Sequence, residues 1–454
     1  MQSKESADLL IAPRWLLPIA PVNTSLGDHG VVITGGRIVA VGPVADLDAR
    51  FEPRERVFRT AHALLPGFVN AHTRASMSLF RGLPVYAPLM RWLRETVSPA
   101  ELRSVSPDFV RVGTQLAIAE MLRAGITSFC DSYLFPDEVA RTASAARVRA
   151  VIGLPVSETA SAWAESATAH FARAERLWDE YKTSPWISLY FAAPPSYAIG
   201  DALLGRLRSV ADELDARIAM PVHETELEVR DALSHHGRRP LHRLAHLGLL
   251  RPGFTAVNMN RLDATDLELT RETGISVVAC PQSNLRLGNG SCPVSQLIER
   301  AVNVGLGSDY PVSAGAFDLL AEARLAALLA GGQRDGVASE SGDSNGDGAL
   351  SSSEALGMAT LGGAVALGLG GVCGSIEAGK AADLVCVDLA TLACQPGTQV
   401  ADTVLFAATR QQVSDVWVAG RAAVSEGHLL AFDEQELIHL AQDWARRIQL
   451  EVAA

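Results

Sequence analysis

The residues best suited to chemistry stand at the ends of short apolar runs. His72 ends the run LLPGFVNAH, His223 and Glu224 end RIAMPVHE, and Asp309 ends VNVGLGSD. Imidazole and carboxylate side chains can bind a metal ion or transfer a proton. We therefore ask which fold would bring the ends of these runs together.

The middle of the chain alternates between short apolar runs and longer helical stretches. Eight runs read as strands: LLPGFVNAH, TSFCD, RAVIGLP, WISLYFAAP, RIAMPVHE, TAVNMN, SVVACP and VNVGLGSD. Stretches such as 109–123 and 201–215 read as the helices between them. Continuous apolar runs are typical of strands that are buried on both faces. Eight β–α repeats predict an α/β fold, a (β/α)₈ TIM barrel, in which functional residues lie where strands end.

Both ends of the chain have a β-rich texture that differs from the middle. The runs are ADLLIAPRWLLPI, GVVITGGRIVAVG and RVFRTAHALLPG near the start, and ADLVCVDL, DTVLFA and QVSDVWVAGRAAV near the end. They predict one small β-sandwich domain formed from both termini. We expect sandwich segments at 1–62 and 373–432, the barrel at 63–372 and a C-terminal helix at 433–454.

Composition narrows the class of protein. The 454 residues carry a formal net charge of −12, and no run of five or more Lys or Arg occurs, which argues against nucleic acid and anionic membranes as partners. No apolar run approaches the roughly 20 residues of a membrane span, and the N-terminus does not read as a signal peptide. The six cysteines lack CxxC spacing, so we expect reduced thiols and a cytoplasmic protein.

Five motifs occur in one order along the chain: LLPGFVNAHTRASMSLFRGLP, VHETELEV, CPQSNLRLGNG, GLGSD and GSIEAGKAADLVCVDL. Together they resemble the amidohydrolase superfamily, most closely its branch of S-adenosylhomocysteine/5′-methylthioadenosine deaminases and triazine hydrolases. The resemblance implies a Zn²⁺-activated water, a carboxylate that shuttles its proton, and a small-molecule substrate. It also implies a homo-oligomer, a dimer or larger.

The family pattern has two histidines after strand one, one histidine each from strands five and six, and an aspartate after strand eight. Here His72 and Asp309 match, and Glu224 matches the proton shuttle. The other places hold different residues: Arg74, Pro221 and Asn258, with Pro194 at the substrate-contacting histidine after strand four. Arginine stays charged and proline has no side-chain donor, so we expect a degenerate site without a transition metal.

Two interpretations of Arg74 stay open. Its guanidinium could replace the cation and form a bidentate pair with Asp309, or it could point to solvent. His223 could instead be an overlooked ligand, since residues two apart share one face of a strand.

Three functions follow. The main expectation is a protein that binds a small N-heterocycle or nucleoside-like ligand and, if catalytic, acts without a transition metal through Arg74, His72, Glu224 and Asp309, with His223. One alternative is a metal-dependent hydrolase or deaminase, with Zn²⁺, that acts on a C–N bond of an adenosine-like or triazine-like substrate. The other alternative is a non-catalytic structural or regulatory paralogue.

Further residues are candidates for substrate contact, each with a structural alternative. Trp92 lies where this branch has a substrate-covering segment, and Met77 and Phe80 follow strand one, but all three also suit core packing. Asn258 lies in strand six. Asn284 either shapes the loop after strand seven or contacts the ligand.

A second motif is independent of the barrel. Residues 343–354 match a calcium-binding loop, with ligands expected from Asp343, Asn345, Asp347, the carbonyl of Ala349, Ser351 and Glu354. Structural Ca²⁺ is one interpretation. The alternative is a capping box, in which Ser351 and Glu354 open the following helix.

Overall fold

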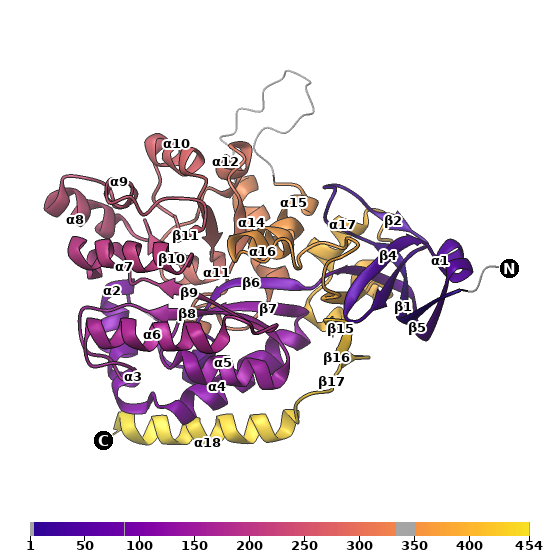
Figure 1. The fold of residues 1–454 in the computed structure, drawn as a ribbon, viewed down its shortest axis with the longest axis horizontal. Helices are drawn as coiled ribbons and strands as arrows, with labels where there is room; N and C mark the ends of the chain where they lie inside the picture. The colour runs from indigo at the N-terminus through magenta and orange to yellow at the C-terminus, as the bar shows by residue number, and fades with distance from the viewer. Residues whose placement is uncertain (1–3, 86, 333–349, 454) are drawn as a thin grey trace.

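A computed structural model describes residues 4–85, 87–332 and 350–453, the last four of these by backbone alone. The chain forms a barrel and a separate sheet beside it, and a long C-terminal helix lies along the outside of the barrel (Figure 1). The N-terminus lies on the side of the separate sheet, whereas the C-terminal helix ends at the far side of the barrel.

The barrel consists of eight parallel strands in sequence order. They are β6 (Phe68–Thr73), β7 (Ile126–Asp131), β8 (Arg149–Pro155), β9 (Ile187–Ala192), β10 (Arg217–Val222), β11 (Phe254–Asn258), β12 (Ser276–Ala279) and β13 (Val304–Leu306). A parallel bridge between Thr73 and Asp309 brings the last strand back to the first, so the barrel is nearly closed. The eight predicted strands and the TIM-barrel class are confirmed.

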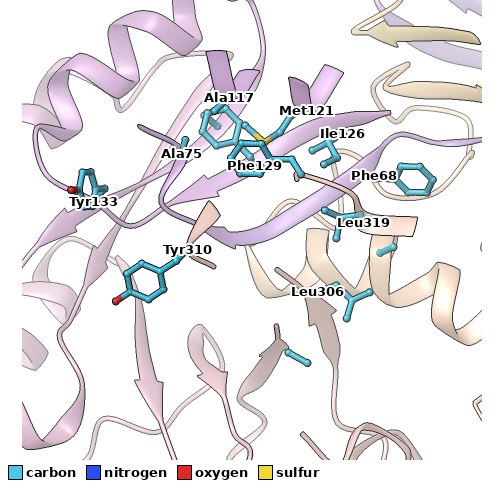
Figure 2. Close-up of a cluster of buried hydrophobic side chains, with 14 of the residues drawn as sticks. Phe68, Ala75, Ala117, Met121, Ile126, Phe129, Tyr133, Leu306, Tyr310 and Leu319 are labelled. Atoms are coloured by element: carbon cyan, nitrogen blue, oxygen red, sulfur yellow. The ribbon is translucent and has the colours of Figure 1, made fainter. Parts of the chain in front are cut away.

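Helices cover the barrel, and their starts follow from local sequence. Helix α4 (Pro107–Arg123) begins where the Ser106 hydroxyl accepts the amide N–H of Phe109, and α7 (Asp201–Glu213) begins with an acidic residue. The core between α4 and the strands includes Phe68, Met121 and Phe129, all 1% exposed or less. Figure 2 shows Tyr133 and Tyr310 at the edge of this cluster, with their hydroxyls directed away from it.

The second sheet combines both ends of the chain, as predicted. In the sheet's order, its strands are β17 (His428–Leu429), β16 (Arg421–Ser425), β15 (Val413–Val418), β14 (Leu384–Asp388), β5 (Phe51–Pro66), β1 (Glu5–Leu16), β3 (His29–Thr34) and β4 (Arg37–Pro43), and β2 (Leu26–Gly27) pairs with β1. The antiparallel pair β14–β5 joins the two terminal segments. The prediction of a strand at DTVLFA is wrong, because residues 400–407 are helical and bury Val404 and Leu405 against neighbouring helices.

Two contacts fix the barrel against the rest of the chain. Arg149 at the start of β8 donates to both oxygens of Asp383, just before β14. Helix α18 (Glu434–Ala453) packs on α4, where the Trp444 ring meets the edge of Phe109 at 5.3 Å. The predicted limits of the domains stay a prediction, although the strand bounds fall close to them.

The proposed calcium loop is mostly outside the described residues, which omit Asp343, Asn345, Asp347 and Ala349. Its last part forms the capping box: the Ser351 hydroxyl accepts the Glu354 amide N–H, and the Glu354 carboxylate accepts the Ser351 amide N–H. These contacts open α15 (Ser352–Gly357) and need no ion. Across the described part of the chain, no helix combines the length and apolarity that a bilayer crossing requires.

Candidate active site

A cavity of about 260 Å³ opens at the mouth of the barrel. His72, Arg74, Glu101 and Tyr133 line it. Pro194 and Pro221, the prolines that replace two histidines of the family pattern, line it as well. The strand ends therefore meet at this cavity, as the barrel predicts.

His72 and Asp309 form the floor of the site. Their Nε2 and Oδ1 atoms lie 3.5 Å apart, and both side chains are 4% exposed or less. The Asp309 amide N–H donates to the His72 carbonyl at 3.0 Å, and Ser283 donates its hydroxyl to Asp309 Oδ2 at 3.0 Å. Gly307 permits this close approach, since a Cβ there would lie 2.7 Å from the His72 carbonyl oxygen.

Arg74 also lies near Asp309, but in neither of the two arrangements considered from the sequence. Its Nε lies 3.9 Å from Asp309 Oδ1 and has no hydrogen-bond partner among the described residues. Its Nη1 donates to the Ser132 carbonyl at 3.2 Å, and its guanidinium lies 4.3 Å from the centroid of the Tyr310 ring. Arg74 therefore neither forms a bidentate pair with Asp309 nor points to solvent. It lies along the cavity wall as a cation on an aromatic ring.

Glu224 is a buried carboxyl held by amide groups. Asn289 Nδ2 donates to its Oε1 at 3.0 Å, and the Asn258 side chain also hydrogen-bonds to it. Burial raises the pKa of Glu224 well above its ordinary value, and the negative charges of Asp309 and Glu228 raise it further. Both effects favour the protonated form of Glu224, so this carboxyl is suited to exchange a proton with a bound molecule.

Two more carboxyls lie near the cavity. Glu101 accepts the Tyr133 hydroxyl at 2.7 Å, and burial raises its pKa. Asp131 accepts the Ala75 amide N–H, its Oδ2 has no hydrogen-bond partner among the described side chains, and burial raises its pKa to about 7. The carboxyls around the mouth outnumber the single arginine, so the site favours protonation or a bound positive charge.

His223 is not available to the cavity. Its Nδ1 pairs with the Arg261 carbonyl at 3.0 Å, and its Nε2 accepts the Leu241 amide N–H at 3.1 Å. Burial lowers the pKa of this imidazole to about 4. The prediction that residues 221 and 223 share one face fails because β10 ends at Val222 and His223 adopts a left-handed backbone with φ 55°.

The candidate substrate contacts divide into two groups. Asn284 donates to Asn258 at 3.2 Å, so both amides belong to the network that holds Glu224. Trp92, Met77 and Phe80 are 1% exposed or less, and none of the three lines the cavity. The Trp92 indole donates to the Pro84 carbonyl and meets the edge of Tyr310, so it supports the wall under Arg74.

Sequence reasoning missed several residues of the site. Ser132 directly follows the strand TSFCD, so the strand-end rule could have identified it. Glu228 and Asn289 lie inside motifs already recognised, VHETELEV and CPQSNLRLGNG. Tyr190 and Tyr133 give no comparable signal, because an aromatic residue in an apolar run reads as core.

Comparison with known proteins gives consistent matches. Residues 63–423 match the amidohydrolase family. The chain is 36% identical to a 5-methylthioadenosine/S-adenosylhomocysteine deaminase of Saccharophagus degradans, over the full length of both. A crystal structure of an adenosine deaminase from Xanthomonas campestris with bound zinc is 42% identical, covers 99% of this chain and 100% of its own, and superposes with a TM-score of 0.94. A zinc-bound atrazine chlorohydrolase of Arthrobacter aurescens, 21% identical with 96% and 100% coverage and a TM-score of 0.86, shares the fold.

These matches contradict two expectations from the sequence. The zinc in the Xanthomonas structure, in a chain 42% identical, overturns the expectation that no transition metal belongs to this site. The deaminase relatives likewise overturn the main expectation of a metal-free ligand-binding protein and favour the metal-dependent hydrolase or deaminase alternative. The error came from treating missing donors as proof that the metal had been lost.

The donors of this chain still differ from a three-ligand zinc site. His72 Nε2 and Asp309 Oδ1, 3.5 Å apart, suit two donors of one ion. In the described ranges, however, no group of three or more His, Cys, Asp or Glu side chains is placed to hold a metal ion. The side chains present therefore do not fit the family's full ligand set.

Fold, ordered motifs and matches along the whole barrel agree on one assignment: the chain belongs to the amidohydrolase family.

Proposed function

We propose that this chain is a hydrolase that removes the exocyclic amino group of an adenosine-like substrate at the mouth of its barrel. The observation that carries the proposal is Glu224, a buried carboxyl held by amide side chains, whose pKa is raised in part by the nearby charge of Asp309 in the His72–Asp309 pair. Support also comes from full-length relatives named as deaminases of adenosine derivatives.

The residues of the mouth suit deamination in a specific way. Replacing an amino group by oxygen from water requires a proton for the departing amine, and the raised pKa of Glu224 favours the protonated carboxyl that can supply it. Hydrogen bonds with Asn258 and Asn289 hold its carboxyl in place. Arg74 adds a positive charge beside Asp309, which limits the repulsion between Asp309 and any negative charge that develops on the substrate ring.

The space also suits a nucleoside. The cavity of about 260 Å³ is deep enough for a heterocyclic base. A second cavity of about 430 Å³ is lined by Ser196 and Tyr197, which follow Pro194 and Pro195 of the first cavity directly in the chain. We assign the second cavity to the sugar and its substituent. The lining of Met90, Tyr197 and Leu227 offers apolar contact to a thioether or alkyl group.

Ammonia release tests the proposal directly. The purified chain, as isolated and after equilibration with zinc sulfate, is incubated with adenosine, 5′-methylthioadenosine or S-adenosylhomocysteine. We expect ammonia and the matching 6-oxo product from at least one of them. The isosteric variant Glu224→Gln should lower kcat by about 10²–10⁴, the usual contribution of a general acid or base.

Two results would overturn the proposal. One is the absence of ammonia from every nucleoside in both metal conditions, together with no nucleoside binding by calorimetry. The other is a Glu224→Gln variant that retains full activity. A cytoplasmic location and a homo-oligomeric state stay predictions. The six buried free cysteines are compatible with a reducing compartment.

A further inference from the structure

The main chain of Glu224 is held by side chains and not by the sheet. Strand β10 ends at Val222, and His223 adopts a left-handed backbone with φ 55°. The Glu224 amide N–H donates to Glu228 Oε2 at 2.7 Å, and the Glu224 carbonyl accepts Asn260 Nδ2 at 3.1 Å. Glu228 is 3% exposed and Asn260 is 8% exposed. A backbone in a sparsely populated region persists only where its surroundings hold it, and here two buried side chains do so.

Glu228 lies in the first turn of α8 (Glu226–His236), yet capping of that helix does not explain its orientation. The N-cap is Thr225, whose side chain accepts the Glu228 amide N–H at 3.2 Å. In a capping box, the carboxylate at this position bonds back to the amide of the N-cap residue itself. Glu228 Oε2 reaches one residue further, to the amide N–H of Glu224.

The second oxygen of Glu228 joins a neighbouring strand end. Glu228 Oε1 accepts the Ser196 hydroxyl at 3.0 Å, and Ser196 lies just after β9. The Ser196 carbonyl in turn accepts Arg243 Nη1 at 2.6 Å, and Arg243 Nη2 is paired with Asp201 at 2.6 Å. Ser196 lines the second cavity. Glu228 therefore connects the backbone of Glu224 to a segment that is itself fixed by an arginine.

We propose that Glu228 is a positioning residue, whose carboxyl group holds the backbone of Glu224 at the mouth of the barrel and ties it to the segment after β9. An amide N–H can only donate, so the bond from Glu224 needs an acceptor at Oε2 and does not depend on a charge. The role therefore belongs to the length and the acceptor atom of this side chain.

The catalytic consequence rests on the proposed function. If Glu224 exchanges a proton with the substrate, a shift of its backbone moves the carboxyl away from the reacting atom. A misplacement of about 1 Å can cost ~10²-fold in rate. The hydrogen bond between Glu228 and the Glu224 amide can be measured without any substrate.

Residues 223 and 224 form the only His–Glu step in the sequence, which allows one amide to be observed alone. In protein labelled with carbonyl carbon-13 in histidine and nitrogen-15 in glutamate, only the Glu224 amide is bonded to a labelled carbonyl. We expect its proton to have a downfield shift and to exchange slowly with solvent, because it is buried and bonded to a carboxyl oxygen.

Two substitutions at Glu228 separate length from charge. Glu228→Asp keeps the charge but is one methylene shorter, so the Glu224 amide signal should move upfield and exchange at least about tenfold faster. Glu228→Gln loses the charge but keeps the length and one acceptor oxygen. Its amide can donate to the Ser196 hydroxyl, which also accepts, so the Glu224 signal should stay close to the native one.

Kinetics of nucleoside deamination give the second measurement, with each variant assayed at its own pH optimum. We expect Glu228→Asp to lower kcat by about 10–10²-fold, with a smaller change in KM, and Glu228→Gln to keep most of the native kcat. Glu226→Ala is the matched control, because it removes an exposed carboxylate from the same first turn of α8. It should change neither the Glu224 amide signal nor kcat.

The proposal is overturned if the Glu224 amide in Glu228→Asp keeps its native shift and exchange rate. It is also overturned if Glu228→Gln loses as much kcat as Glu228→Asp, or if Glu226→Ala reproduces the effect. Its failure is separable from that of the proposed function. The expected amide signals without ammonia release remove the function alone, whereas ammonia release with an unaltered amide in Glu228→Asp removes the positioning role alone.

Discussion

Two arginine–aspartate pairs in this molecule differ in how many of their polar atoms form hydrogen bonds. At the joint between barrel and terminal sheet, Arg149 Nε donates to Asp383 at 2.9 Å and Nη1 donates to the Pro185 carbonyl. Asp383 also accepts the Ala419 amide N–H at 2.7 Å. At the mouth, Arg74 Nε lies 3.9 Å from Asp309 and has no hydrogen-bond partner in the part of the chain that is described.

The difference separates a structural pair from a site that is prepared for a ligand. When the donors and acceptors of a buried ion pair are already hydrogen-bonded within the protein, none remains to bind another molecule, so the pair serves to hold structural elements together. At the mouth, Arg74 lines the cavity, and its Nε is one of the buried polar atoms that have no hydrogen-bond partner among the described residues. Such atoms cost free energy in the isolated protein, and a ligand that bonds to them recovers it.

The largest expected effect on stability comes from breaking the saturated pair. Arg149→Ala leaves Asp383, 1% exposed, without its cation at the joint. Removing one partner of a buried pair costs about 3–5 kcal/mol, and we expect that loss in the free energy of unfolding in urea. Arg59→Ala would serve as a control at the more exposed pair with Asp415. A loss below about 1 kcal/mol for Arg149→Ala would show that the joint does not depend on this pair.

Glu322 shows what a buried carboxyl does without any arginine. It is fully buried, its Oε1 has no hydrogen-bond partner among the described residues, and burial raises its pKa from 4.5 to about 8. A raised pKa in the folded state means that stability is full below the unfolded pKa and falls as pH rises toward 8. Because each unit is worth ~1.4 kcal/mol, the loss between pH 6 and 8 is about 2–3 kcal/mol.

The isosteric variant Glu322→Gln should remove that part of the pH dependence. Urea unfolding of both proteins at pH 6, 7 and 8 measures it. As pH rises, the free energy of unfolding of the variant should increase relative to that of the native chain. Parallel curves across this range would show that Glu322 ionises normally in the folded state.

The smallest expected effect is that of Arg74→Ala. The Arg74 side chain is 22% exposed, and its guanidinium makes one hydrogen bond to the Ser132 carbonyl and lies on the Tyr310 ring. We expect a loss of about 1–2 kcal/mol in unfolding free energy, the sum of a weak hydrogen bond and a cation–π contact. Nucleoside binding should weaken in the same variant. A loss as large as that of Arg149→Ala would erase the distinction between the two pairs.

Most of the fold could be predicted from the sequence, because burial on both faces leaves a visible pattern. The eight strands appear as uninterrupted apolar runs, and the ordered motifs located His72, Glu224 and Asp309. DTVLFA misled the prediction because an apolar run of six residues suits a short helix as well as a strand.

The site was less predictable, because the alternation of side-chain direction along a strand, which allows the facing of each residue to be counted, stops where the strand ends. His223, Asn258 and Asp309 all have positive φ, so the direction of each side chain cannot be counted from the strand before it. Counting placed His223 in the cavity, whereas the turn directs it to the Arg261 carbonyl and the Leu241 amide. The same reasoning took missing histidines as loss of the metal, which the zinc-bound relative contradicts.

By itself, the sequence determined the barrel, the sheet from both termini and the three polar residues at the strand ends. It could do so because hydrophobic patterning and motif order are local properties of the chain. Only the tertiary structure decided the geometry of Arg74, the exclusion of His223 and the hydrogen bond that joins Glu228 to Ser196. These depend on contacts between residues from 18 to more than 200 positions apart, and only the folded barrel sets their distances.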